Sequence, residues 1–146
     1  MAAKMNRITA MIVFVSMLSA APLPALADVV VIVNPSIGLE SLAEADVQRL
    51  FLGKTKSLPN QKAAVVVAQK EVSPTRAMFD KNVLKKTPNQ MKAYWSQLIF
   101  TGRATPPNEF GDDAQVKKLV AENPNIVGYI DGASLDGTVK AVYTAK

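Results

Sequence analysis

Two short runs of consecutive apolar residues limit the folds open to this chain more than any other feature. Val29 to Val33 is an unbroken β-branched run that ends at Asn34-Pro35, and Ala63 to Ala68 reads Ala-Ala-Val-Val-Val-Ala. A strand with one face in water alternates apolar and polar residues, whereas a strand covered on both faces is apolar throughout. Both runs are therefore predicted to be strands of a sheet that is covered on both faces.

Two further strands are expected toward the C-terminal end, at Asn125 to Ile130 and at Thr138 to Tyr143. The last of them alternates more and is expected to lie nearer an edge of the sheet. Arg103 to Gly111 contains Pro106-Pro107 and is predicted to be extended surface chain, and Asp131 to Gly137 is predicted to be a turn.

Helices are expected between the strands, and each carries a start signal. The signals are a capping box at Ser41 to Glu44, Ser73-Pro74, Thr87-Pro88 with Gln90, and Asp112 with Gln115. In the third helix, apolar residues recur at helical spacing and are predicted to face the core: Met91, Tyr94, Trp95, Leu98 and Ile99. Strands separated by helices predict an α/β fold of three layers, with a mixed central sheet flanked by helices.

The first 27 residues have the pattern of a secretory signal peptide. Lys4 and Arg7 precede an apolar stretch from Ile8 to Ala21, and Ala25-Leu26-Ala27 fits a cleavage site. The stretch is shorter than the roughly 20 residues that span a bilayer, so a membrane anchor is the less favoured interpretation. Cleavage would leave residues 28–146 as one soluble domain, periplasmic or secreted, with no membrane insertion and no Cys to carry a lipid.

The chain contains no His and no Cys, which excludes Ser-His-Asp triads, Cys nucleophiles and the usual zinc and iron–sulfur ligands. Asp131 to Asp136 does not match the ligand register of a calcium-binding loop. No catalytic residue, metal site or cofactor is predicted, and the protein is expected not to be an enzyme. The net charge of +5 comes from scattered residues, so nucleic acid is not an expected partner.

The segment that joins the second strand to the second helix offers a candidate anion site. In open α/β sheets ligands bind beyond the carboxyl ends of strands, where a helix N-terminus presents free N–H groups. Ser73 and Thr75 could add hydroxyl donors and Arg76 a charge-assisted hydrogen bond. The alternative is that Ser73 only caps the helix and Arg76 points to solvent.

Four motifs, taken together, resemble the phosphate-binding proteins of ABC importers. They are Leu50-Phe-Leu-Gly-Lys54, the valine strand that runs into a Ser-x-Thr helix start, Phe100-Thr-Gly-Arg103, and Asn125-Ile-Val-Gly-Tyr-Ile130. The resemblance covers nearly all of residues 28–146. It implies a periplasmic-binding-protein fold, of which this chain resembles the one lobe that holds the Ser-x-Thr loop.

The resemblance also implies a ligand and its contacts. In that family the loop binds phosphate through a Ser-Gly-Thr helix start, with an Arg four residues before the Ser. Here Ser73 and Thr75 match, Pro74 replaces the Gly, and Gln69 stands at the position of the Arg. Ser73, Thr75, Arg76 and Gln69 are thus the candidate anion-binding residues.

These observations predict an exported, non-enzymatic protein of the solute-binding type that binds phosphate or a related anion. Its expected partners are the anion and either the membrane components of an ABC transporter or a second copy of the chain. Because a single lobe leaves the ligand open to water, tight binding is expected to need a second surface that closes over the site. The alternative is an adaptor or structural interaction domain that has lost ligand binding.

Overall fold

The computed structural model describes residues 28–146, so the predicted signal peptide at residues 1–27 lies outside the described residues. A five-stranded sheet forms the centre of this part of the chain. Its strands are β1 (Val29–Val33), β2 (Val65–Gln69), β3 (Asn108–Phe110), β4 (Ile126–Asp131) and β5 (Lys140–Ala145). In the order β3-β2-β4-β1-β5, β2 is parallel to β3 and β4, and β1 is antiparallel to β4 and β5. The sheet is therefore mixed, as predicted, and β5 lies at an edge.

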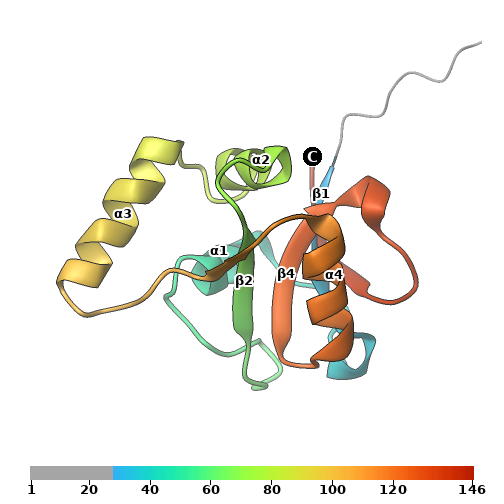
Figure 1. Ribbon diagram of the computed structural model, residues 1–146. Helices are drawn as coiled ribbons and strands as arrows, with labels where there is room; N and C mark the ends of the chain where they lie inside the picture. Colours follow the sequence, from blue (N-terminus) through green and yellow to red (C-terminus); the bar gives the residue numbers. More distant parts are fainter. Residues whose placement is uncertain (1–27) are drawn as a thin grey trace, which may run out of the picture.

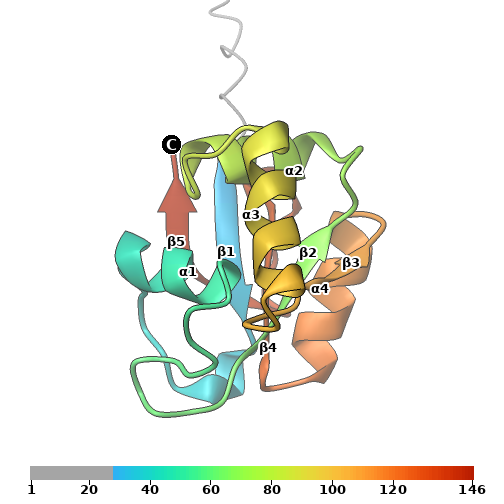
Figure 2. The ribbon, with the colours of Figure 1, turned by 90° about the vertical axis from the view of Figure 1, so that its left-hand side faces the viewer.

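Helices cover both faces of this sheet (Figure 1). They are α1 (Glu44–Phe51), α2 (Pro74–Asn82), α3 (Pro88–Phe100) and α4 (Asp113–Glu122), with short 3₁₀ helices η1 (Pro35–Ile37) and η2 (Gly132–Ser134). Figure 2 looks onto α3, which lies with α1 and α2 on one side of the sheet, while α4 lies on the other. The predicted three-layer α/β class is confirmed. Within residues 28–146, no helix combines the length and apolar character needed to cross a membrane.

The apolar run in β1 is explained by two separate cores, one on each face of the sheet. Val29, Val31 and Val33 pack in the cluster that α1, α2 and α3 cover. Val30 and Ile32 pack in the smaller cluster under α4. Because successive side chains of a strand point to opposite faces, both sets must be apolar.

Gly128 in β4 allows α4 to pack closely on the sheet. A Cβ at this position would lie only 2.5 Å from Val116 Cγ1 of α4. A β-branched valine has little rotameric freedom in a helix with which to give way. The glycine of the Asn125 to Ile130 motif therefore has a packing role.

One helix start was predicted wrongly. α1 begins at Glu44 with Ala43 at the N-cap and no side-chain capping bond, so Ser41 forms no capping box. The backbone N–H of Leu42 instead donates to the carbonyl of Val142 in β5, at 2.8 Å. This long-range bond holds the segment before α1 against β5 at the edge of the sheet, and the chain becomes helical only after Ala43, whose backbone is extended.

The other start signals are confirmed. Ser73 caps α2, Thr87 and Gln90 form a capping box on α3, and Asp112 caps α4. In each case the capping side chain accepts from a backbone N–H of the first turn, which needs only local sequence.

The segment at 103–111, predicted to be surface chain throughout, contains the edge strand β3. Asn108 to Phe110 pair in parallel with Val67 to Gln69 of β2. The three residues show no strand periodicity of their own, so their pairing follows from the position of β2.

The apolar stripe of α3 is only partly buried. Met91 and Trp95 are in the core, whereas Ile99 is 55% exposed. Figure 1 shows that the C-terminal end of α3 lies farther from the sheet than its N-terminal end. The prediction that Ile99 faces the core is therefore wrong.

Candidate functional site

The four candidate anion-binding residues lie together at the carboxyl end of β2. Gln69 is the last residue of β2, Ser73 is the N-cap of α2, and Thr75 and Arg76 belong to its first turn. The Ser73 hydroxyl donates to Gln69 Oε1 at 2.5 Å, and Arg76 Nη1 donates to the Gln69 carbonyl at 3.0 Å. The short loop of residues 70–72 thus brings the predicted residues into direct contact.

The Gln69 side chain is a buried connector between elements. It is 1% exposed, and its Nε2 donates to Asp113 Oδ1 of α4 at 2.5 Å and to the Tyr129 carbonyl of β4 at 3.1 Å. Together with the bond from Ser73, these contacts use both ends of the amide. Gln69 therefore joins β2 to α2, α4 and β4 and presents no free donor to a ligand.

The Arg76 side chain lies against the protein, between Asp80 and Glu109, rather than in solvent. Its side chain is 15% exposed, and it pairs with the carboxylates of Asp80 in α2, at 3.5 Å, and of Glu109 in β3. Burial raises the pKa of the Asp80 carboxyl, and the neighbouring guanidinium partly offsets that rise. The alternative that Arg76 is a solvated side chain is thus wrong, and its guanidinium already has anionic oxygens beside it.

The hydroxyl groups at the start of α2 are buried as well. Ser73 and Thr75 are each only 9% exposed. Ser73 Oγ accepts from the backbone N–H of Arg76 at 3.3 Å while it donates to Gln69. An incoming anion would have to compete with these internal bonds.

Tyr129 of β4 contacts both Gln69 and α2 at the candidate site. Its ring stacks on Phe79 at a centroid distance of 4.0 Å, and its hydroxyl accepts from the backbone N–H of Gln69 at 3.1 Å. Burial raises the pKa of the Tyr129 phenol far above its usual range. The carboxyl end of β2 is therefore held in place by a neutral, buried phenol.

This burial predicts an alkaline limb of stability. Since the folded state holds the Tyr129 proton more tightly than the unfolded chain, the free energy of unfolding should fall as pH rises above about 10, by up to roughly 1.4 kcal/mol per pH unit. The Tyr129→Phe variant should lack this component. It should also lose about 1–3 kcal/mol at neutral pH, because the Gln69 N–H loses its buried partner. Urea unfolding at several pH values measures both effects.

Tyr94→Phe is the control for this experiment, because the Tyr94 hydroxyl donates to the Leu52 carbonyl from a partly buried position. Burial raises the pKa of the Tyr94 phenol too, but less than that of Tyr129, so this variant should keep most of the alkaline limb. An alkaline limb that is unchanged in Tyr129→Phe would contradict the assignment.

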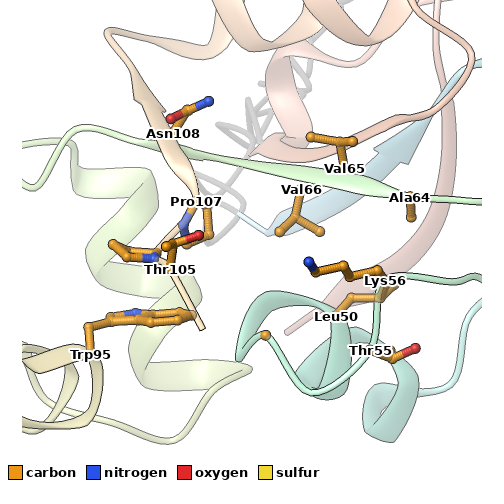
Figure 3. A pocket seen from close by; sticks show the side chains of 12 residues that line it. Leu50, Thr55, Lys56, Ala64, Val65, Val66, Trp95, Thr105, Pro107 and Asn108 are labelled. Atoms are coloured by element: carbon orange, nitrogen blue, oxygen red, sulfur yellow. The ribbon is translucent and has the colours of Figure 1, made fainter. Parts of the chain in front are cut away.

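A cavity that the sequence did not predict lies at the amino end of β2, away from the candidate residues at its carboxyl end, between β2, α1 and α3 (Figure 3). Its volume is about 300 Å³. The lining residues are Leu50, Gly53, Thr55, Lys56, Ala64, Val65, Val66, Trp95, Thr105, Pro106, Pro107 and Asn108. They come from segments far apart in the sequence, so no local motif signals the cavity.

The described residues offer no metal centre. Among residues 28–146, no group of three or more acidic side chains is placed to hold a metal ion. The site is thus built from hydroxyl, amide, guanidinium and carboxylate groups.

The fold of this chain is similar to that of several solved structures. No protein-family model matches the sequence, and no curated protein matches it. Solved structures do match. An ABC-type phosphate transport receptor from Vibrio cholerae is 20% identical, with a TM-score of 0.64 over 80% of this chain and 46% of the receptor. PstS from Borrelia burgdorferi is 11% identical, with a TM-score of 0.59 over 80% of this chain and 47% of that one.

A third match has a ligand. It is a protein from Clostridium perfringens assigned as the substrate-binding component of a phosphate ABC transporter, with bound phosphate. It is 21% identical, with a TM-score of 0.63 over 80% of this chain and 45% of that protein. The chain thus has the fold of these phosphate ABC transporter binding proteins, and it spans less than half of their length.

Proposed function

We propose that this chain is an exported, non-enzymatic binding protein that takes phosphate or a related anion at the N-terminus of α2. The matched structures named as phosphate transport receptors support this proposal, as does the place of Ser73, Thr75 and Arg76 beyond the carboxyl end of β2. Export through residues 1–27 and delivery to the membrane components of an ABC transporter belong to the same proposal.

The observation that carries the proposal is the ion pair between Arg76 and Glu109. The carboxylate of Glu109 places an anionic oxygen against the guanidinium of Arg76. A phosphate oxygen could therefore occupy the same place beside the guanidinium. The Glu109 side chain is 46% exposed, whereas that of Arg76 is 15% exposed. The carboxylate can therefore swing into solvent while the guanidinium stays in place, and phosphate takes its position.

This exchange predicts weak binding by a single chain. Each new hydrogen bond to a charged group contributes about 1.5–3 kcal/mol, whereas association has an entropic cost of at least about 4 kcal/mol. Displacement of Glu109 lowers the gain further. A Kd of about 1 mM, which corresponds to roughly 4 kcal/mol, is the tightest that the isolated chain should reach.

Calorimetric titration with phosphate and with sulfate tests the proposal through Glu109→Gln. The variant keeps the side-chain shape and removes the competing charge, so its phosphate affinity should rise about fivefold or more. Arg76→Gln should remove binding. Glu122→Gln at the end of α4 makes the same change in net charge on the opposite face of the sheet and should leave the affinity unchanged.

A second function is favoured by the internal bonds of the same residues. The donors of Gln69 and Ser73 already have protein partners, which suits an adaptor or interaction domain that has lost its ligand. If Glu109→Gln and the unaltered protein both fail to bind phosphate at concentrations far above 1 mM, the anion-binding proposal is refuted and this alternative is supported.

A further inference from the structure

We propose that the cavity between β2, α1 and α3 is a separate binding site for a small organic anion, one with an apolar body and a carboxylate group. The proposal is independent of the anion site at α2, because it concerns other side chains and another class of ligand.

The volume and lining of the cavity suit such a molecule. Ligand pockets are typically about 300–1,000 Å³, mostly apolar, with a few placed polar groups. This cavity holds about 300 Å³ and is walled by Leu50, Val66, Trp95 and Pro107, among others. A single aromatic ring with a short substituent fits this space.

The charge of the lining selects an anion. Lys56 is the only ionisable residue among those that line the cavity, and no Asp or Glu is among them. Figure 3 shows its amino group extending toward the space between Val66 and Thr105. Within residues 28–146, Lys56 takes part in none of the ion pairs. An ammonium group without a carboxylate beside it is available to a ligand.

The backbone around Lys56 is fixed. Its carbonyl accepts from the N–H of Ala64, at 2.9 Å, just before β2. Thr55 Oγ1 accepts from the Ser57 N–H at 3.2 Å. These bonds anchor the loop on both sides of Lys56, so a ligand does not have to order it.

Inorganic phosphate does not suit this cavity. A small, strongly hydrated anion would give up much of its water in return for one ammonium group and the neutral polar side chains of Thr55, Thr105 and Asn108, beside apolar walls, which is unfavourable. An aromatic carboxylate instead buries its ring against those walls and keeps its charge at Lys56. A void of about 20 Å³ that contacts Arg76 shares Trp95 and Pro107 with the cavity wall, so these two residues stand between the two sites.

Titration with phenylacetate, followed by tryptophan fluorescence, tests the proposal. Trp95 is the only tryptophan of the chain and lines the cavity. We expect a saturable change in its emission, with a Kd of about 1 mM, and affinity at least about fivefold weaker for the neutral analogue phenylacetamide. Phosphate should not displace phenylacetate, so this result does not depend on the outcome at α2.

The Lys56→Gln variant isolates the charge. It should bind the two analogues equally while its thermal unfolding stays unchanged, because Lys56 is an exposed side chain. Lys118→Gln, an equally exposed change on the far face of the sheet, should keep the preference for the carboxylate. Absence of a saturable signal in the unaltered protein, or a preference that survives Lys56→Gln, would overturn the proposal.

Discussion

Replacing Trp95 by Ala is expected to lower the free energy of unfolding by about 3–5 kcal/mol. Trp95 is 7% exposed and forms an edge-to-face pair with Tyr94 at 5.2 Å. A Cβ at Gly53 would lie 3.3 Å from its ring, which shows how closely the α1 end packs on the indole. α3 buries only Met91 and Trp95, so removing the indole leaves a cavity and takes away one of the two side chains that attach this helix to the core.

Urea unfolding followed by circular dichroism measures this loss. A small domain has a total stability of about 5–15 kcal/mol, so the variant should be near its unfolding threshold at room temperature. Phe100→Ala is the matched control, since this aromatic residue of the same helix is 93% exposed. The control should stay within about 0.5 kcal/mol of the unaltered protein. Equal stabilities for the two variants would show that α3 contributes no core.

Replacing Gln69 by Leu is expected to cost about 1–3 kcal/mol for each buried group that loses its partner. Leucine has nearly the same size but cannot bond the Ser73 hydroxyl, the Asp113 carboxylate or the Tyr129 carbonyl. The loss should be larger than that from any single hydrogen bond of the network, because one amide satisfies three groups.

A double variant identifies the cause of this loss. Adding Ser73→Ala to Gln69→Leu removes one orphaned hydroxyl, so the two changes should cost less together than the sum of their separate effects. Gln97→Leu, on the exposed face of α3, controls for the change in side-chain type and should have little effect. Strict additivity, or a Gln69→Leu variant as stable as the control, would mean that Gln69 holds no network together.

Much of the fold follows from short-range patterns. The apolar runs indicated the strands β1 and β2, and the caps at Ser73, Thr87 and Asp112 indicated three of the four helix starts. Burial on both faces is confirmed for all of β1, whereas β2 is covered only in its second half and Val65 is 48% exposed. These features depend on neighbours within a few residues, which sequence displays directly. Where tertiary contacts are involved, the patterns were wrong. α1 begins at Glu44 rather than directly after Ser41, in a segment bonded to β5 through Leu42 and Val142, and Asn108 to Phe110 form a strand by pairing with β2.

For the candidate site, too, the sequence predicted the local arrangement of the residues but not their long-range contacts. The adjacency of Gln69, Ser73, Thr75 and Arg76 could be predicted, because a strand, a short loop and a helix start fix it locally. The bonding of these residues could not, since the groups that engage them come from elsewhere. Glu109 arrives on β3 and Asp113 on α4, separated from Arg76 and Gln69 by 33 and 44 residues.

The sequence by itself determined the layer architecture, three helix starts and the residue types at the end of β2, because backbone propensity and burial pattern are local properties of the chain. Only the tertiary structure decided what those residues bind. It placed the Glu109 carboxylate on the guanidinium of Arg76, gave hydrogen-bond partners to both ends of the Gln69 amide, and left the Lys56 ammonium beside a cavity whose walls are mainly apolar. Charge pairing acts between atoms a few ångströms apart in space, and sequence distance carries no information about that separation.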